Sequence, residues 1–283
     1  MPSAILLISC PDRAGLVASI TQFIFAHDGN ILHLDQHVDQ QVNVFFMRVE
    51  WDLAKFTIPQ EEITARFEPI ARLFDMTWQL TFSDTLLKMA IFVSKESHAL
   101  YDLLSRWQSG DLPVEIPIII SNHSELGHVA GQFNIPFEMV SVNKEDRTIA
   151  EREQLAILQK FNIDFVVLAK YMQIITEGFI QHYPHRIINI HHSFLPAFIG
   201  AKPYHQAFTR GVKIIGATSH YVTADLDAGP IIEQDVSRVT HKDSVADLVR
   251  RGKDLEKTVL SRAVYYHVQH RVLVYNNKTI VFA

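Results

Sequence analysis

The sequence predicts an α/β protein of two domains, and three observations lead to that fold class. The 283 residues exceed one domain of average size, so about two are expected. In residues 1–83, segments with strand and helix periodicity follow in the order strand, helix, strand, strand, helix, strand. In residues 84–283, strands and helices alternate, which is typical of a mostly parallel sheet covered by helices on both faces.

The N-terminal domain, residues 1–83, is expected to have the ferredoxin-like βαββαβ topology. Its first strand is short and apolar and ends at Pro11, where a turn leads into a helix. That helix starts at Leu16 and stops at Gly29, close to the start of the next strand. The expected strands cover 4–10, 30–38, 42–51 and 77–82, and the second helix covers 59–74.

The second domain, residues 84–283, is expected to be Rossmann-like, with a doubly wound sheet. The strand at 164–169 is almost purely apolar, as expected where both faces of a sheet are covered. Asn276 and Asn277 form a two-residue hairpin turn between two short C-terminal strands. No Gly-x-Gly-x-x-Gly follows the first strand, so no nicotinamide cofactor is predicted. The other expected strands cover 87–93, 115–122, 137–142, 186–190, 216–222 and 231–236, and the helices cover 98–107, 124–133, 148–161, 179–183 and 244–267.

Composition narrows the functional classes. The chain is 48% hydrophobic and 20% charged, and no apolar run is long enough for a membrane span. Residues 1–83 carry 5 of the 26 Lys and Arg and 10 of the 31 Asp and Glu, and no basic stripe suggests a nucleic-acid partner. A single cysteine, Cys10, lies in an apolar strand and is interpreted as a small buried hydrophobe. The N-terminus lacks the basic region of a signal peptide, so the cytoplasm is expected.

Polar groups gather at the end of one strand and in one later loop. Asn189 lies in the strand 186–190, His191 follows it, and Asp225 and Asp227 occupy a Gly/Pro loop further on. In α/β proteins, ligands bind at the carboxyl ends of the sheet strands. An amide, an imidazole and a carboxylate that converge there suit acid–base chemistry with stabilisation of an oxyanion.

Structural roles remain open for each of these residues taken singly. Asn189, His191 and Asp227 also fit a capping amide, a loop histidine and a turn carboxylate. His192 and His220 fit structural roles better than ligand roles, because adjacent histidines point differently and His220 lies in an expected strand. The 15 histidines are scattered without metal-ligand spacing, so no metal site is predicted.

The segment Pro11-Asp12-Arg13-Ala14-Gly15-Leu16, followed by a helix and Asn30, resembles an ACT domain, a module that commonly binds amino acids. The resemblance places a regulatory ligand near Asp12, Gly15 and Asn30. Backbone N–H groups at a helix N-terminus can receive a carboxylate. A capped helix without ligand fits the same residues.

From about Leu87 onward the chain resembles the formyltetrahydrofolate-dependent formyl transferase and hydrolase family. Three segments carry the resemblance in family order: Leu168 to Ile175, Asn189 to Pro196 and Asp225 to Ile232. It implies that Asn189, His191 and Asp227 are catalytic. It also implies a folate substrate, held by Met172, Gln173, Ile174 and Ile175 and by the loop with Thr223 and Asp225. The implied reaction requires no cofactor. Gln173 stands where glycinamide ribonucleotide transformylases usually carry arginine, which leaves one contact open.

The loop after the first strand of the second domain indicates the acceptor of the formyl group. Transformylases place a glycine-rich loop there to hold a substrate phosphate, whereas this chain has Ser94-Lys95-Glu96-Ser97-His98. Water is then the expected acceptor. An ACT-like domain before such a core also resembles the formyltetrahydrofolate deformylase family.

That resemblance implies hydrolysis of 10-formyltetrahydrofolate, which feeds formate to purine synthesis and balances the one-carbon pool. It also implies a homo-oligomer and an amino-acid effector, with glycine or methionine as first candidates. Two alternatives stay open at this point: a phosphoribosylglycinamide formyltransferase and a non-catalytic amino-acid sensor.

Overall fold

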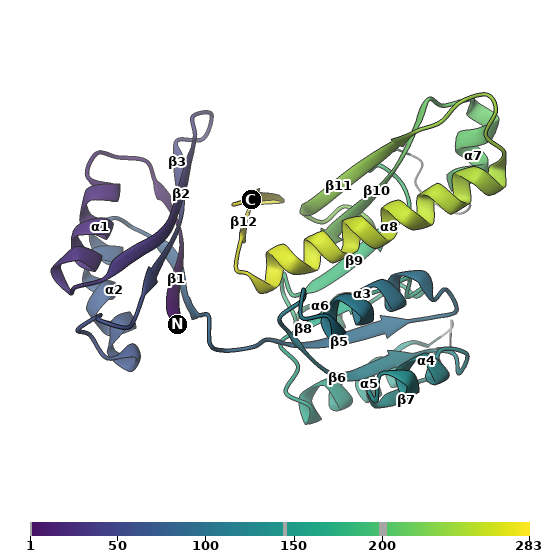
Figure 1. Ribbon diagram of the computed structural model, residues 1–283, viewed down its shortest axis with the longest axis horizontal. Coiled ribbons are helices and arrows are strands. Elements are labelled where there is room, and N and C mark those ends of the chain that lie inside the picture. Colours follow the sequence, from purple (N-terminus) through teal and green to yellow (C-terminus); the bar gives the residue numbers. More distant parts are fainter. Residues whose placement is uncertain (1, 144–145, 198–202) are drawn as a thin grey trace. The chain divides into compact units, whose positions relative to one another are not determined.

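A computed structural model describes residues 2–143, 146–197 and 203–283, and the chain forms two compact units (Figure 1). Unit 1 runs through Thr85 and includes Gln269–Leu273 and Ile280–Ala283, whereas unit 2 contains Leu86–Val268 and Val274–Thr279. The predicted α/β class is confirmed, with a ferredoxin-like antiparallel sheet in unit 1 and a mostly parallel sheet in unit 2.

Unit 1 has the predicted βαββαβ order and one antiparallel sheet with strand order β2-β3-β1-β4. Alternate residues of β1, from Ala4 to Cys10, enter a core shared with both helices, as the strand period of two requires. Burial raises the pKa of the Cys10 thiol to about 11, which fits the expected buried hydrophobe. The elements are β1 (Ser3–Pro11), α1 (Leu16–Ala26), β2 (Asn30–Asp39), β3 (Val44–Asp52), the short 3₁₀ helix η1 (Gln60–Glu62), α2 (Ile63–Leu73) and β4 (Thr77–Phe82).

Arg48 of β3 holds C-terminal residues within unit 1. Its Nε donates to the carbonyl oxygen of His270 over 3.1 Å, and Nη2 donates to that of Gln269 over 3.2 Å. Nη2 also lies 3.0 Å from Glu50 Oε2, and the Ser3 hydroxyl donates to Glu50 over 2.7 Å. The Arg48 side chain is only 6% exposed, so these partners satisfy a buried charge.

Unit 2 is built on a sheet with strand order β11-β10-β9-β8-β5-β6-β7. Five neighbouring strands, β9, β8, β5, β6 and β7, are parallel to one another. Strand β10 runs antiparallel to both β9 and β11. The strands are β5 (Lys88–Val93), β6 (Glu115–Ser121), β7 (Phe137–Met139), β8 (Phe165–Leu168), β9 (Ile187–His191), β10 (Ile214–Tyr221) and β11 (Ile231–Arg238), and a hairpin follows with β12 (Val272–Tyr275) and β13 (Lys278–Val281).

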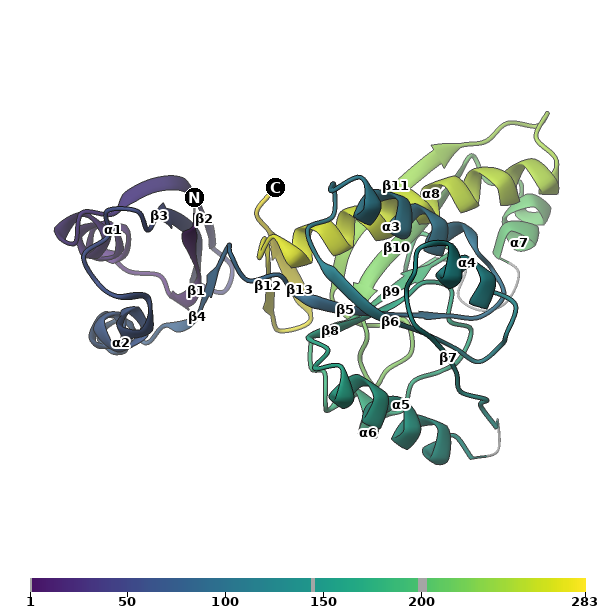
Figure 2. The same cartoon turned by 60° about the horizontal axis from the view of Figure 1, so that its bottom comes forward.

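Helices cover both faces of this sheet (Figure 2). The helices are α3 (His98–Gln108), α4 (Gly127–Gln132), α5 (Thr148–Lys160), α6 (Glu177–Ile180), α7 (Pro203–Arg210) and α8 (Val245–Val268). One apolar core joins β5, β6 and β8 to α5 and α6, and on the other side α8 packs on β9, β10, β11 and α3. Every residue of β8 is buried, which agrees with its apolar sequence.

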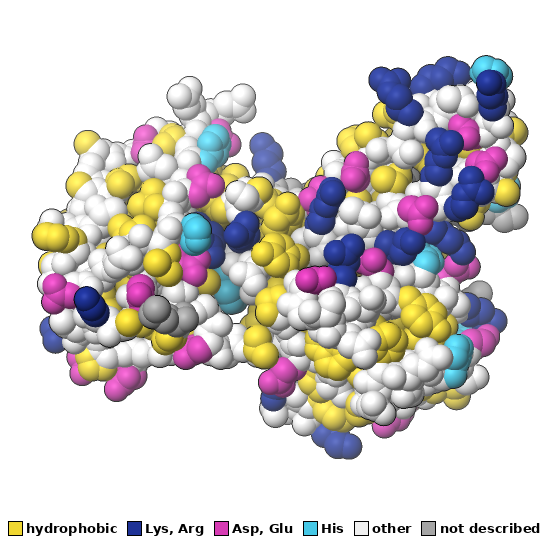
Figure 3. Space-filling view, viewed as in Figure 1, with side chains coloured by type: hydrophobic (Ala, Val, Ile, Leu, Met, Phe, Trp, Pro, Cys, Tyr) yellow, Lys and Arg dark blue, Asp and Glu magenta, His cyan; other side chains and the backbone are white. Residues whose placement is uncertain are grey.

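The outward surface of α8 carries charges of both signs, and Figure 3 shows dark blue and magenta side chains alternating along it. Arg250 lies 2.7 Å from Asp247, and Lys257 lies 2.7 Å from Asp254. Such exposed pairs at helical spacing contribute a few tenths of a kcal/mol each. Opposite them, the apolar face fixes α8 against the sheet.

Some element boundaries differ from those expected. β7 covers three residues, because it is an edge strand that pairs with β6 alone, and α6 covers four. β9 extends through His191, so Asn189 and His191 both lie in the strand. The hairpin turn has Asn276 at a φ of 53°, as a two-residue turn requires. Among the described residues, no helix is long and apolar enough to cross a membrane.

Candidate active site

The register of three strands brings the polar groups together. Asn189 and His191 point to one face of β9, since side chains two residues apart share a face. The parallel neighbour β8 places Leu168 beside Asn189. The antiparallel neighbour β10 places His220 beside Asn189 on the other side. From the sequence, a structural role for His220 was favoured over a role in the site, and the structure places His220 in the wall of the candidate site.

The tautomer of His220 follows from its contacts. Its Nδ1 lies 3.0 Å from the carbonyl oxygen of Tyr221, which can only accept, so Nδ1 carries the proton. Nε2 is then an acceptor, and the Asn189 amide donates to it over 3.3 Å. Burial lowers the pKa of His220, which favours this neutral ring. A side-chain amide has two N–H groups, so the second N–H of Asn189 can serve a bound molecule.

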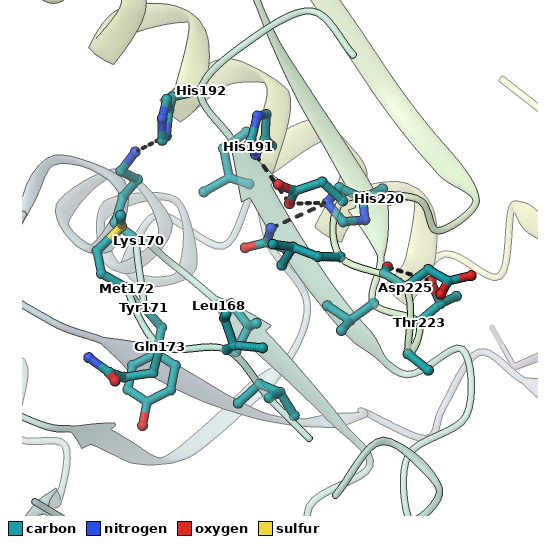
Figure 4. A pocket seen from close by; sticks show the side chains of 18 residues that line it. Leu168, Lys170, Tyr171, Met172, Gln173, His191, His192, His220, Thr223 and Asp225 are labelled. Atoms are coloured by element: carbon teal, nitrogen blue, oxygen red, sulfur yellow. Dashed lines mark hydrogen bonds and ion pairs between the residues drawn. The ribbon is translucent and has the colours of Figure 1, made fainter. Parts of the chain in front are cut away.

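His191 is oriented by a carboxylate. Its Nδ1 donates to Asp227 Oδ1 over 3.2 Å, as the dashed line in Figure 4 shows. This hydrogen bond lowers the pKa of Asp227, which is therefore ionised at neutral pH. Within the described residues, the other ring nitrogen of His191, Nε2, is buried without a hydrogen-bond partner. It is the atom that can exchange a proton with a ligand.

The loop after β10 positions Asp227 through tight backbone packing. Asp227 has a φ of 55°, a left-handed conformation that Asp tolerates better than most residues. Gly229 approaches the preceding strand so closely that a Cβ there would lie 1.8 Å from the carbonyl oxygen of Tyr221. The Tyr221 N–H donates to the carbonyl oxygen of Pro230 over 2.9 Å and closes the loop.

A cavity of about 400 Å³ lies against these groups, which is a suitable size for a heterocyclic ligand. Its lining contains every residue that the sequence assigned to the catalytic and substrate sites: Asn189, His191, Asp227, Met172, Gln173, Ile174, Ile175, Thr223 and Asp225. Leu168, Ile190, Val222 and Leu226 add apolar wall. Figure 4 shows the segment after β8 and the Thr223–Asp225 segment on opposite sides of this cavity.

Some polar groups of the cavity wall are already engaged. The Met172 N–H donates to Ser94 Oγ over 3.0 Å, and the carbonyl oxygen of Ile174 accepts from Arg147 over 3.4 Å. The Thr223 hydroxyl donates to the carbonyl oxygen of Asp225 over 3.1 Å. These bonds fix the shape of both walls, and they commit one backbone donor, the Met172 N–H, that the sequence had assigned to a ligand.

A buried ionic cluster beside the cavity was not predicted. Glu256 of α8, 2% exposed, lies 3.2 Å from Lys170 Nζ, and Lys170 lies 3.1 Å from His192 Nδ1. The rings of His191 and His192 are stacked, 5.0 Å apart and 12° from parallel, rather than directed apart as expected. A glutamate beside the apolar stripe of α8, next to Leu255, was the available signal, since a carboxylate is rarely buried without partners.

The three residues assigned to a regulatory ligand are not brought together within the chain. Gly15 is the N-cap of α1 with a φ of 94°, and Asp12 lies in the turn before it. Asn30 starts β2 beyond the other end of α1, and it pairs with Asp52, which in turn faces Ser3. Asp12 therefore lies near one end of the sheet and Asn30 at the other. In the described part of the chain, no group of three His, Cys, Asp or Glu side chains could hold a metal ion.

Known proteins resemble both parts of the chain. Residues 87–264 match the formyl transferase family and residues 4–69 match the ACT domain. A formyltetrahydrofolate deformylase of Synechocystis is 55% identical over 99% of both chains. The Bacillus subtilis protein of that name is 50% identical over 98% of this chain and 93% of its own.

Solved structures agree with these matches. A formyltetrahydrofolate deformylase from Pseudomonas syringae has a TM-score of 0.97 and 46% identity, covering 100% of this chain and 95% of its own. A glycinamide ribonucleotide transformylase from Symbiobacterium toebii has a TM-score of 0.67 and 28% identity, covering 72% of this chain and 98% of its own.

Proposed function

Because the chain belongs to the formyltetrahydrofolate deformylase family, we propose that it hydrolyses 10-formyltetrahydrofolate to formate and tetrahydrofolate. The observation that carries the proposal is the arrangement around the cavity. An ionised carboxylate holds one nitrogen of His191, the other nitrogen is unpartnered among the described residues, and an amide with one uncommitted N–H stands two residues away. These are a proton carrier and an oxyanion donor on one cavity wall.

In the proposed reaction, water attacks the formyl carbon and a C–O bond forms. His191 Nε2 takes a proton from the water, while Asp227 holds the ring through Nδ1 and stabilises its positive charge. The Asn189 amide donates its second N–H to the carbonyl oxygen as negative charge develops, a contribution of about 3 kcal/mol per donor in comparable sites. His191 then passes the proton to N10 as the C–N bond breaks, and the formic acid ionises. Water is the co-reactant, so the proposed reaction requires no cofactor.

The folate heterocycle is proposed to lie between the two cavity walls. Leu168, Ile174 and Val222 supply apolar surface for its rings. Backbone groups of 173–175 and of 223–227 supply polar contacts, whereas the Met172 N–H is committed to Ser94. Gln173, which stands where glycinamide ribonucleotide transformylases usually carry arginine, lines the same cavity, and no folate contact is assigned to its side chain.

The loop Ser94–His98 supports water rather than a phosphorylated amine as the acceptor. Glu96 lies 2.6 Å from Lys253, and the hydrogen bond from that lysine lowers the pKa of Glu96, which is therefore ionised. Its carboxylate would repel a phosphate, and the loop has no glycine through which backbone N–H groups could approach one.

The test is formate release from 10-formyltetrahydrofolate by the purified protein, with and without glycinamide ribonucleotide. We expect release at the same rate in both reactions, with no formylated product. Turnover that requires the amine would assign a transferase instead, and absence of turnover together with amino-acid binding would assign a sensor.

The proposal extends to an effector ligand and to the assembly of the protein. We propose that unit 1 binds an amino-acid effector, glycine or methionine being the first to test, and that the protein is a homo-oligomer. The turn from Asp12 to Gly15 is the proposed effector contact, since Gly15 opens α1 and its N-terminal N–H groups can receive a carboxylate. The formate released is proposed to feed purine synthesis and so to balance the one-carbon pool.

A further inference from the structure

Lys170 has a backbone conformation that its residue type rarely adopts. It lies two residues beyond β8 and has a φ of 63°, in the left-handed region. Within the described ranges, ten non-glycine residues have positive φ, and the other nine are Asn, Asp or His, the types that tolerate this region. Such strain persists where surrounding contacts hold it, and it concentrates at functional sites.

The contacts of Lys170 hold a charged side chain in one place. The side chain is 9% exposed, and its Nζ lies 3.2 Å from Glu256 Oε2 and 3.1 Å from His192 Nδ1. Glu256 also accepts from His98 over 2.8 Å and from the Tyr204 hydroxyl over 2.7 Å. These hydrogen bonds and the Lys170 charge outweigh burial and lower the pKa of Glu256 to about 2. The Glu256 carboxylate is thus an ion-pair partner that holds the Lys170 ammonium group in place.

Lys170 stands where two cavities meet. It lines the candidate active-site cavity and a second cavity of about 500 Å³, together with Met172, Gln173 and His192. The second cavity is also lined by Ser94, Glu96 and other residues of the loop that replaces a phosphate-binding loop. A nucleophile that entered through the second cavity would pass Lys170 before it reached His191, whose ring stacks on His192.

We propose that Lys170 is a specificity-determining residue that excludes amine acceptors from the formyl group and leaves water as the nucleophile. This inference rests on the function proposed above. When water attacks, a C–O bond forms, the C–N10 bond breaks and one proton of the water passes to N10. Water enters the cavity as a neutral molecule, and His191 takes its proton as the C–O bond forms.

An amine would meet a charge barrier at the same position. When an amine attacks, a C–N bond forms and the C–N10 bond breaks, and the amine nitrogen is positive until one of its protons passes through His191 to N10. The products are an N-formyl amine and tetrahydrofolate. A fixed ammonium beside this nitrogen opposes the positive charge, as it also opposes entry of the protonated amine.

The experiment measures how the formyl group divides between water and glycinamide, a small amine without phosphate. Wild-type protein, Lys170→Met, Lys170→Gly and Lys170→Arg are each incubated with 10-formyltetrahydrofolate and glycinamide. Formate, N-formylglycinamide and tetrahydrofolate are quantified. Met removes the charge and retains most of the volume, Gly removes both and suits the positive φ, and Arg keeps the charge. Lys160→Met, an exposed lysine at the end of α5 that packs on Phe161, is the matched control.

We expect wild type, Lys170→Arg and Lys160→Met to release almost only formate. In Lys170→Met and Lys170→Gly, the share of formyl groups on glycinamide should rise by about tenfold or more, as removal of a like-charge contact implies. A share that stays at the wild-type value in Lys170→Met, or a rise in Lys170→Gly alone, would show that charge is not the cause and would overturn the proposal. A wild-type protein that released no formate would instead overturn the proposed function.

Discussion

At the scale of single residues, the chemistry depends on which nitrogen of each histidine is occupied. His220 carries its proton on Nδ1 toward Tyr221, and His191 carries one on Nδ1 toward Asp227. The two rings therefore differ in what Nε2 does. In His220 it accepts from Asn189, whereas in His191 it has no partner within the described part of the chain and can take part in proton transfer.

Asp227→Asn tests the orienting role of the carboxylate. The amide cannot stabilise a positive His191, so kcat for formate release should fall by about 10²- to 10⁴-fold, the range for loss of such a partner or of general-base catalysis. Asp254→Asn, on the exposed side of α8, is the control and should retain the wild-type rate. Steady-state kinetics with a thermal melt of each variant provide the check, and a folded Asp227→Asn at full rate would contradict the assigned role.

Sequence reasoning selected Asn189, His191 and Asp227 because their residue types suit one chemistry and their segments match a family in order. It did not select His220, Lys170 or Glu256. His220 enters the site only through its pairing opposite Asn189, and strand pairing of β10 with β9 cannot be read from local periodicity. Lys170 and Glu256 are 86 positions apart in the chain, one in the segment after β8 and the other on α8.

At the scale of elements, the loop from Val222 to Pro230 determines where Asp227 stands. Gly229→Ala adds one methyl group that would lie 1.8 Å from the carbonyl oxygen of Tyr221, so the loop must shift. We expect kcat to fall by about tenfold or more although no functional side chain is removed, because small displacements in a catalytic arrangement are costly.

Gly131→Ala is the matched control for this substitution. Gly131 lies in α4, and nothing lies within 4 Å of an added Cβ. The variant should keep its activity and gain up to about 1 kcal/mol of stability from helix propensity. Equal activity of Gly229→Ala and Gly131→Ala would show that the tight approach at Gly229 does not position Asp227.

Elements with strong periodicity were predictable, and those whose length depends on tertiary partners were not. The unit 1 topology, the hairpin turn at Asn276 and Asn277 and the long α8 follow from local pattern. β7 is shorter than its apolar run because it has a single neighbouring strand. β9 extends through His191 because β10 continues to pair with it, Thr218 facing His191.

At the scale of the whole molecule, the chain returns to unit 1 directly after α8. The sequence shows no change in composition at this point from which the return could be predicted. His270 lies in that return, and burial together with Arg48 lowers its pKa to about 4. The unfolded chain has a histidine pKa of about 6.5. Between pH 6.5 and pH 4, the unfolded chain binds a proton at His270 more readily than the folded protein does. The stability that neutral His270 gives the folded protein above pH 6.5 is therefore lost as the pH falls toward 4.

His270→Gln tests this linkage. Between pH 7 and pH 5, the free energy of unfolding should fall by about 2 kcal/mol more in the wild type than in the variant. This follows from a loss of about 1.4 kcal/mol for each pH unit below the unfolded pKa of about 6.5. His241→Gln, an exposed histidine, should behave as wild type. Denaturant unfolding at both pH values measures the difference, and parallel losses in wild type and His270→Gln would remove His270 as the cause.

In the proposed function, water attacks the formyl group in the cavity lined by Asn189, His191 and Asp227. The most direct measurement is the isotopic content of the formate released in water enriched in the heavy oxygen isotope, without any amine present. Each formate should carry one oxygen from the solvent and one from the formyl group, and Asn189→Ala should slow its appearance by about 10²- to 10³-fold. Formate that carries no solvent oxygen, or no formate until an amine is added, would contradict it.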